Sequence, residues 1–538
     1  MKFLKIQNFH GFLAMEDLPH DCIFNKVHTG CGATTIVLEN NQNYVVAVPT
    51  TELIVNKCYP THDKDGNTRY WDPAEVKPGK SPVKNLFGLY GNFTFTLQGK
   101  LREYLKQVGV KKILCTYDKL PKVISFINPL DFRLAIDEYH FLLKAYAYRN
   151  VAIEGVLSCF RCFKSFCFIS ATPIPIDFKP TELDDVEELV ADWDITRTIR
   201  LFPVHTDKPY HEAAKLIKDC KKDGFNRIDG FKSDEIIFFV NSVTQIKKIL
   251  GYVNLEEDEY KIICADTDKN RQTLKPDYKI SSTTSEPRRF TFVTSKAFEG
   301  VDFFSETALC VVVTDINCPH TLVSIDMDIP QIAGRIRTAT NPLKNTIYHI
   351  YNTKPGDSGL SYEEKKKELK LEMVAANERV DKFKSLSPDA QKQEIEDVKQ
   401  LGINSYLRYN KQTATLEVND MVAKLKLFNH KILCLTYSSD ASLIQQYQGN
   451  GAQTSSVIWN VATPDDVKAI RIHKFRDALY RYLTLKEKNP LSIGGEIYEL
   501  ESRYPILSVA WLSIGAKEMR RLRSETLIAE AVKKHYNN

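Results

Sequence analysis

The chain of 538 residues lacks any run of eighteen apolar residues, the length a membrane-spanning helix requires. Its first stretch, MKFLKIQNFHGFLAMEDL, contains neither a long apolar core nor a small-residue cleavage site. A strong excess of one charge is also missing, because 73 Lys and Arg residues face 68 Asp and Glu residues. We therefore expect a soluble, cytoplasmic protein without membrane association, in which local basic patches hold any polyanionic partner.

A disulfide framework is missing as well. The twelve cysteines are scattered, which favours reduced thiols in apolar cores. Cys159, Cys162 and Cys167 cluster in SCFRCFKSFCF, but no second pair of Cys or His residues lies nearby. Because zinc usually takes four ligands, packed thiols are the favoured interpretation of this cluster.

Two series of apolar, strand-like runs alternate with helical stretches, and this alternation predicts two α/β lobes with parallel sheets. Segment 180–194 is acidic and is interpreted as the linker between the lobes, and segment 68–85 as an exposed insertion. After residue 355, Glu and Lys recur at helical spacing. The expected organisation is a first domain at 1–180, a second at 195–354 and a mainly helical region at 355–538.

The stretch HTGCGATT is typical of a phosphate-binding loop, except at one position. Gly30, Gly32 and Thr34 follow the pattern G-x-G-K-T, but Ala33 stands where the lysine belongs. Such loops bring backbone N–H groups to phosphates at the start of a helix. The loop therefore predicts a nucleotide site that has lost its usual cation.

Acidic and hydroxyl side chains follow other predicted strands. Asp137 and Glu138 in IDEYH can hold a metal ion and orient an attacking water, respectively. Ser170 and Thr172 in SATP are expected near the same sheet edge. In the second series, TSKAFEGVDF places three polar or small residues after a strand. These are Glu299, Gly300 and Asp302.

The segment QIAGRIR is expected to form one helix that carries Gln331, Arg335 and Arg337. Two arginines there can reach across a cleft to the γ-phosphate, where charge grows as the bond breaks. In order, the glycine loop, VPTTELIVNK, TYDKL, DEYH, SATP, IIFFVNS, TSKAFEGVD and QIAGRIR closely resemble the motifs of superfamily 2 helicases of the DExH type. The resemblance spans roughly residues 20 to 353.

This resemblance implies two RecA-like lobes that bind ATP and Mg²⁺ in the cleft between them. It implies that Asp137 and Thr34 hold the metal, that Glu138 is the catalytic base, and that Gln331, Arg335 and Arg337 close on the nucleotide. The residues implied to bind the nucleotide are Gly30, Cys31, Gly32, Ala33, Thr34, Thr35, Gly300 and Asp302, with Lys26 as a candidate. The residues implied to touch the phosphates of a nucleic-acid strand are Thr50, Thr51, Thr116 and Thr294.

Two departures from the family pattern stand out. The usual ending is Q-x-x-G-R-x-x-R, whereas Arg337 comes one residue early, which favours Arg335 as the acting arginine. For Ala33, three interpretations remain open. A cation from elsewhere replaces the lysine, with Lys26 the first candidate and Lys296 or Arg335 the others; the protein is a nucleotide-insensitive scaffold; or alanine is an engineered replacement.

The implied function is ATP-dependent translocation on, or unwinding of, nucleic acid. The expected partner is single-stranded or duplex DNA rather than RNA, in replication or repair. The noncanonical loop and the short G-R-x-R ending indicate a phage or other mobile-element source, hence a host cytoplasm. The alternative is an inactive helicase-like clamp or assembly module. The sequence identifies no protein partner.

The end of the chain, residues 516–536, is basic and helical and carries Arg520, Arg521 and Arg523. Such a helix can dock on a phosphate backbone, with a helix-turn-helix as one possible form. The competing interpretation is a helix that packs on the second lobe with its basic face in water.

Overall fold

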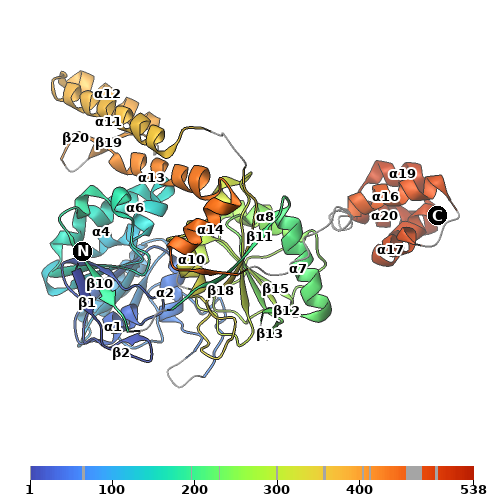
Figure 1. The fold of residues 1–538 in the computed structure, drawn as a ribbon, viewed down its shortest axis with the longest axis horizontal. Helices are drawn as coiled ribbons and strands as arrows, with labels where there is room; N and C mark the ends of the chain where they lie inside the picture. Colours follow the sequence, from blue (N-terminus) through green and yellow to red (C-terminus); the bar gives the residue numbers. More distant parts are fainter. Residues whose placement is uncertain are drawn as a thin grey trace.

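Two parallel sheets follow one another along the chain and form tandem RecA-like α/β lobes, and a helical C-terminal region follows them (Figure 1). The computed structural model describes residues 2–62, 67–194, 197–228, 231–298, 301–354, 359–402, 405–410, 413–455, 475–490 and 495–537.

Lobe 1 contains eight parallel strands in the order β1-β10-β4-β9-β8-β5-β7-β6. Because β4, β9 and β8 are neighbours, the loops that leave their carboxyl ends meet at one sheet edge. The central strands are buried along almost their whole length, as expected for a parallel sheet covered on both faces. The strands are β1 (Lys2–Lys5), β4 (Cys22–Asn25), β5 (Tyr44–Val48), β6 (Leu86–Leu89), β7 (Lys112–Thr116), β8 (Arg133–Asp137), β9 (Ser165–Ser170) and β10 (Glu187–Asp192).

Helices cover the lobe 1 sheet, and a small hairpin lies beside the glycine loop. The hairpin, β2 (Asn8–Phe9) and β3 (Phe12–Leu13), is tied to the loop by a hydrogen bond from the Leu13 N–H to the Cys31 carbonyl at 2.9 Å. The helices are α1 (Ala33–Glu39), α2 (Thr51–Cys58), α3 (Phe95–Lys106), α4 (Leu120–Ile124), α5 (Phe141–Lys144) and α6 (Tyr146–Cys159).

Lobe 2 contains seven parallel strands in the order β15-β16-β14-β17-β18-β11-β21. The strands are β11 (Arg200–His205), β14 (Ile236–Phe239), β15 (Tyr260–Ile263), β16 (Phe290–Val293), β17 (Leu309–Val313), β18 (Thr346–Tyr351) and β21 (Gln453–Thr454). The helices are α7 (Pro209–Asp223), α8 (Val243–Leu250), α9 (Asp268–Leu274) and α10 (Asp328–Ala333), and a separate antiparallel pair consists of β12 (Phe225–Ile228) and β13 (Phe231–Ser233).

The interpretation of segment 180–194 as a linker is wrong for most of its length. Residues Glu187–Asp192 form β10, which lies between β1 and β4 in lobe 1. Val190 and Ala191 are buried in this strand, so the apolar LVA triplet outweighs the acidic residues around it. The passage between the lobes is therefore short and begins after Asp192.

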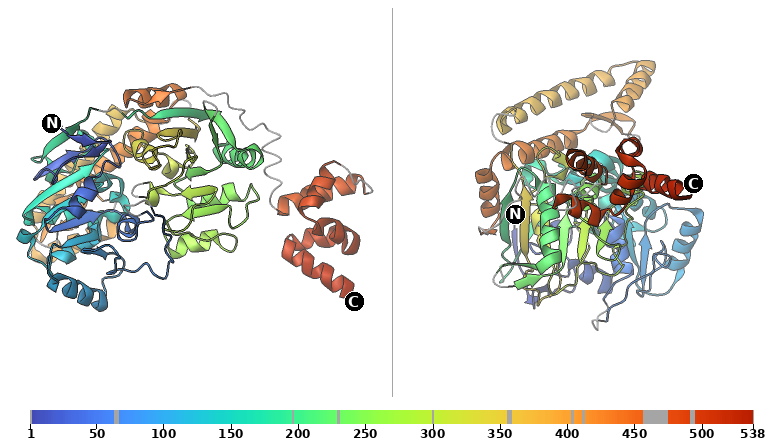
Figure 2. Two further views of the ribbon diagram at one scale, coloured as in Figure 1. Left: turned by 90° about the horizontal axis from the view of Figure 1, so that it is seen from below. Right: turned by 90° about the vertical axis from the view of Figure 1, so that its right-hand side faces the viewer.

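The chain after residue 359 first forms an arm that projects from the lobes (Figures 1 and 2). The arm consists of α11 (Tyr362–Lys384), α12 (Pro388–Leu401), β19 (Leu407–Asn410) and β20 (Thr415–Val418). A capping box starts α11, because Ser361 and Glu364 satisfy each other's backbone N–H groups. The Glu- and Lys-rich pattern predicts this helix correctly.

Beyond the arm, the chain packs against both lobes in turn. Helix α13 (Asp420–Lys431) contributes to the lobe 1 core, whereas α14 (Asp440–Gly449) contributes to the lobe 2 core. A π-helix, η8 (Ile432–Thr436), lies between them. Strand β21 then joins the lobe 2 sheet. The region after 355 is thus mainly helical, as expected, but part of it belongs to the body of the two lobes.

The described C-terminal helices form a bundle with a core of their own, which includes Leu479, Tyr482, Leu507, Met519 and Ile528. The bundle lies beyond lobe 2 (Figures 1 and 2). Within the described part of the chain, none of the helices combines the length and apolar character needed to span a bilayer. The helices of the bundle are α16 (Phe475–Lys488), α17 (Glu496–Arg503), α18 (Ile506–Ser513), α19 (Gly515–Leu522) and α20 (Glu525–Asn537).

Candidate active site between the two lobes

The glycine loop joins β4 to α1 and faces lobe 2. Gly30 and Gly32 have φ angles of 65° and 88°, a left-handed region that glycine enters without the cost a side chain would add. Gly30 also lies against an arginine of lobe 2, because a Cβ built on it would fall 1.8 Å from Nη1 of Arg337. The loop therefore has the backbone of a phosphate loop and meets lobe 2 directly.

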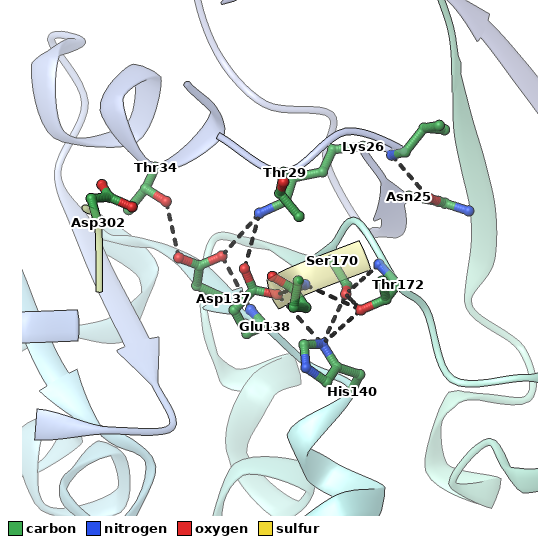
Figure 3. Close-up of polar contacts among 12 residues, drawn as sticks. Asn25, Lys26, Thr29, Thr34, Asp137, Glu138, His140, Ser170, Thr172 and Asp302 are labelled. Atoms are coloured by element: carbon green, nitrogen blue, oxygen red, sulfur yellow. Dashed lines mark hydrogen bonds and ion pairs between the residues drawn. The ribbon is translucent and has the colours of Figure 1, made fainter. Parts of the chain in front are cut away.

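Lys26 reaches the centre of the site. Its side chain is buried, and Nζ lies 3.3 Å from Oε1 of Glu138 and 3.7 Å from Oδ1 of Asp137 (Figure 3). Burial by itself would lower the pKa of Lys26, but the carboxylates of Glu138 and Asp137 outweigh it and raise the pKa above its usual value. Lys26 is thus a fixed positive charge at the carboxylate pair.

The two carboxylates come from the end of β8. The hydroxyl of Thr34, in the first turn of α1, donates to Oδ2 of Asp137 at 2.9 Å. The backbone N–H of Glu138 donates to the other oxygen of Asp137 at 3.1 Å, and Glu138 itself has a φ of 51°. A positive φ at a glutamate costs free energy and recurs at functional sites.

A polar network extends from Glu138 into the lobe interface (Figure 3). Nδ1 of His140 lies 3.4 Å from Oε2 of Glu138 and 2.9 Å from Oγ of Ser170. From lobe 2, the fully buried amide of Gln331 donates to Oε2 of Glu138 at 2.9 Å and to Oγ1 of Thr172 at 3.1 Å. One carboxylate of lobe 1 is therefore held by side chains of both lobes.

The prediction that Gln331, Arg335 and Arg337 share one helix is wrong. Helix α10 ends at Ala333, and the chain then runs beside residue Phe303: the Phe303 N–H donates to the Arg335 carbonyl, and the Arg337 N–H donates to the Phe303 carbonyl, each at 2.9 Å. Positions two apart in such an extended segment face the same side. This geometry explains how arginines at the shortened spacing occupy one site.

Both arginines face Asp302. Nε of Arg337 donates to Oδ1 of Asp302 at 2.7 Å, and Nη1 of Arg335 lies 3.8 Å from the same oxygen. Burial alone would raise the pKa of Asp302, but Arg337, Arg335 and Lys57 lower it to about 2. Arg335 also donates to the Gln331 carbonyl at 2.8 Å. Arg337 therefore lies in the cleft beside the glycine loop, rather than away from it.

A cavity of about 440 Å³ lies between the glycine loop and lobe 2. Its described lining contains six cationic side chains and three carboxylates, so its charge suits a polyphosphate. Burial, together with Arg197 and Arg337, lowers the pKa of Lys344, which shows that these cations crowd one another. The cations are Lys26, Lys57, Arg197, Arg335, Arg337 and Lys344, and the carboxylates belong to Asp137, Glu138 and Asp302.

Arg197, Lys57 and Lys344 were missed by the sequence analysis. Lys57 ends VPTTELIVNK, a motif that was recognised, so its place near the loop could have been suspected. Arg197 belongs to the passage between the lobes. Neither Arg197 nor Lys344 lies in a recognised motif. The expected residues of the glycine loop, by contrast, line the cavity, and Cys31 and Thr35 are among them.

Thr34 and Asp137 are side chains that could hold Mg²⁺ together with phosphate oxygens of a bound nucleotide. Both side chains line the cavity, and their oxygen atoms are neighbours. Mg²⁺ in nucleotide enzymes typically takes one or two protein ligands together with waters and substrate phosphates. No other protein ligand is needed for this arrangement.

A second cavity, of about 420 Å³, lies between the lobes and is lined by Thr50, Thr51 and Thr294. The buried hydroxyl of Thr50 has no hydrogen-bond partner among the described residues, so a group that enters the cavity can satisfy it. Thr116 is buried and does not belong to the described lining. The structure therefore brings together three of the four threonines implied to bind a strand.

Three further expectations meet different outcomes. Lys296 does not face the glycine loop but pairs with Glu52 of lobe 1, Nζ to Oε1, at 2.5 Å. Glu299 and Gly300 lie outside the described residues. In the C-terminal bundle, Arg520 pairs with Glu487, and Arg521 with Glu518. These exposed pairs leave less free positive charge on the bundle than the sequence indicates.

No protein-family model and no curated protein matches this chain. Three solved structures resemble it weakly. Helicase Lhr of Mycobacterium smegmatis, bound to ssDNA and AMP-PNP, shows 12% identity and a TM-score of 0.38 over 92% of this chain and 70% of that one. A variant of Dbp5 of S. cerevisiae, bound to a variant of Gle1 and IP6, shows 12% identity and a TM-score of 0.38 over 62% of this chain and 78% of that one. A DEAD box protein from Methanococcus jannaschii shows 14% identity and a TM-score of 0.26 over 62% and 82%, respectively. Likeness at this level assigns no activity.

Proposed function

We propose that the protein is an ATP-dependent helicase or translocase that acts on a nucleic-acid strand. The observation that carries the proposal is the position of Lys26. Its ammonium lies beside Glu138 and Asp137, whereas the usual lysine position of the loop is occupied by the uncharged Ala33. A scaffold that had lost nucleotide use would gain nothing from a buried lysine fixed between two carboxylates, because burying charges costs free energy.

Each lobe supplies part of the proposed hydrolysis. The glycine loop cradles the phosphates through its backbone, and Lys26, as the relocated lysine, neutralises their charge. Bound Mg²⁺, held by Thr34 and Asp137, would add further positive charge at the phosphates. Glu138 orients the attacking water. Its carboxylate is held in position for this role by a hydrogen bond from Gln331 of lobe 2.

The arginines of lobe 2 complete the site. Arg335 and Arg337 bring two guanidinium groups from lobe 2 to the lining of the cavity, where they can stabilise the negative charge that grows on the γ-phosphate. Because Gln331 and both arginines come from lobe 2, hydrolysis in this proposal requires closed lobes. Opening after hydrolysis would then shift a strand bound in the second cavity, at Thr50, Thr51 and Thr294.

Finer features extend the same proposal. We infer the DExH type from the sequence DEYH. By analogy with helicases of that type, we also infer that the strand is DNA rather than RNA and that the protein acts in replication or repair. Thr50 and its neighbours offer hydroxyl contacts to a backbone and do not distinguish the two nucleic acids. A phage or mobile-element source, with a cytoplasmic location in its host, remains a prediction from the noncanonical loop.

Steady-state ATP hydrolysis, measured with and without single-stranded DNA or RNA, tests the proposal. The protein is compared with Lys26→Ala, Ala33→Lys and the double variant. We expect strand-stimulated hydrolysis in the protein itself and a fall of about 100-fold in kcat for Lys26→Ala, the size of loss seen when one charge-stabilising group is removed. The double variant tests whether a lysine at the usual position restores activity.

The outcomes separate the open interpretations of Ala33. Activity that depends on Lys26 supports the relocated lysine. If the protein does not hydrolyse ATP and only the Ala33→Lys variant does, the site is disabled, which is the result expected for an engineered alanine. If every variant is silent yet binds strands equally with and without ATP, the protein is a clamp and the proposal is wrong.

A further inference from the structure

The segment that joins the lobes runs beside the glycine loop. Trp193 follows the last strand of lobe 1, and its indole Nε1 donates to the backbone carbonyl of Lys26 at 2.9 Å. The ring centroids of Trp193 and His28 are 5.0 Å apart. Farther along the segment, Nη1 of Arg197 donates to the Thr29 carbonyl at 3.0 Å. Two side chains of the inter-lobe segment thus hold two backbone carbonyls at the loop.

The turn after Lys26 is strained. Val27 has a φ of 61°, which is a rare conformation for a β-branched residue. The His28 N–H donates to the Lys26 carbonyl at 2.6 Å and closes a three-residue turn around Val27. Turns of this kind with a positive central φ are rare and strained, and they persist only where the surroundings hold them.

The same carbonyl serves both the turn and the tryptophan. The Lys26 oxygen accepts one bond from the His28 N–H, which closes the turn, and one from the indole of Trp193. The Asn25 side chain adds a third contact, because its Oδ1 accepts from the Val27 N–H at 3.0 Å. The indole bond therefore acts on the residue whose ammonium faces Glu138.

We propose that Trp193 is a positioning residue for Lys26: its indole N–H holds the strained turn and so directs the lysine side chain to the two carboxylates. The inference rests on the proposed function, in which Lys26 replaces the usual lysine of the loop. It also adds a residue of the passage between the lobes to the surroundings of the nucleotide site.

The test compares ATP hydrolysis by Trp193→Phe and by Val27→Gly/Trp193→Phe. Phenylalanine keeps an aromatic ring against His28 but removes the donor, so we expect kcat to fall about 10-fold, with a smaller change in KM. Glycine accepts a positive φ without strain, so the double variant is expected to recover most of the lost kcat. A role in general packing would not give this recovery.

Trp71→Phe is the matched control. The indole Nε1 of Trp71 also donates to a backbone carbonyl, that of Pro60, at 3.0 Å, but Trp71 is not part of the described lining of either cavity. Its kcat is expected to stay within twofold of the unmodified protein. An equal loss in Trp71→Phe and Trp193→Phe would overturn the inference.

A second readout needs no nucleotide. Lys26 is buried and paired, so it should react slowly with an amine-acetylating reagent when labelling is followed by mass spectrometry. Trp193→Phe should label about 10 times faster at Lys26, and the double variant should return to the slow rate. Unchanged kcat and labelling in Trp193→Phe, or losses that glycine does not relieve, overturn the inference. If the unmodified protein hydrolyses no ATP, the proposed function fails, and labelling alone decides whether Trp193 positions Lys26.

Discussion

Gly334 has no side chain at a point where any side chain would meet the glycine loop. A Cβ built on it would fall 1.8 Å from Oγ1 and 2.8 Å from Cβ of Thr29. Its φ is −80°, which every residue adopts, so the requirement for glycine here is steric. The residue therefore permits the close approach of the two lobes at the site.

Gly334→Ala should leave each lobe folded but keep the lobes apart at the site. We expect kcat for ATP hydrolysis to fall about 100-fold, because displacement of catalytic groups by about 1 Å has an effect of that size. Gly99→Ala in α3 is the control, since a Cβ there meets no atom within 4 Å. Normal turnover by Gly334→Ala would show that the lobes need not approach this closely.

Gln331 contacts Glu138 from lobe 2. Gln331→Ala removes the donor to Oε2 of Glu138 and to Thr172, and should lower kcat more than it weakens nucleotide binding, because the amide belongs to lobe 2. Gln331→Glu keeps the shape but sets a carboxylate against Glu138, so its loss should be larger. Steady-state hydrolysis together with binding of a fluorescent ATP analogue separates the two effects. Equal activity of both variants would contradict this assignment.

At the scale of elements, α14 is fastened to lobe 2 through a buried histidine. Nε2 of His349 and Oγ1 of Thr314 are 2.9 Å apart, and Nδ1 of His349 lies 2.7 Å from the hydroxyl of Tyr447 in α14. Burial lowers the pKa of His349 to about 3. The folded protein therefore keeps this imidazole neutral.

The low pKa of His349 predicts a loss of stability in acid. Between pH 6.5 and 3 the unfolded chain binds a proton that the folded protein does not, so the free energy of unfolding falls as pH falls through this window. The full effect is on the order of 5 kcal/mol, from about 1.36 kcal/mol per pKa unit. Denaturant unfolding of the protein and of His349→Gln across this range checks it. The variant should lose this part of the pH dependence; an unchanged dependence would point to other groups.

A buried lysine caps the C-terminus of α1, the helix that follows the glycine loop. Lys112 is buried, and its ammonium donates to the Val37 carbonyl at 2.6 Å and to Oδ1 of Asn40 at 2.7 Å. A cation at a helix C-terminus interacts favourably with the unpaired carbonyls there. Burial lowers the pKa of Lys112 to about 8.

At the scale of the molecule, the chain passes between the lobes more than once, and it returns from β18 of lobe 2 to α11 and α13 on lobe 1. An earlier passage follows Asp192, and a later one is the π-helix η8 between α13 on lobe 1 and α14 on lobe 2. Side chains add to the join, because Lys144 of lobe 1 pairs with Asp328 of lobe 2. Lobe movement must therefore be accommodated at each of these passages.

The C-terminal bundle is expected to be a separate unit of folding. Its core contains no described residue of the lobes, and the lobe cores contain no residue of the bundle. A protein that ends at Ser455 should therefore keep the thermal unfolding of the lobes and their ATP hydrolysis. Calorimetry of both proteins checks this, with an additional transition expected only in the full chain. Loss of the lobe transition on truncation would show that the bundle supports the lobes.

Local patterns were enough to predict the strands and most of the helices that carry the site. The apolar runs before Asp137 and Ser170 identify buried strands, because such strands require apolar residues. The glycines before Thr34 identify a loop, because a positive φ favours glycine. The interpretation failed where apolar content was brief, as in β10, and at α10, whose end at Ala333 depends on pairing with Phe303.

The sequence by itself therefore determined the two α/β lobes, the glycine loop and the carboxylate pair. Only the tertiary structure decided that Lys26 meets Glu138, 112 residues away, and that Gln331 meets it from 193 residues away. The physical reason is that periodicity records which face of an element is buried, whereas these contacts depend on strand order, on the turn at Val27 and on the approach of the lobes. That is why Trp193 carries no motif and yet contacts the loop.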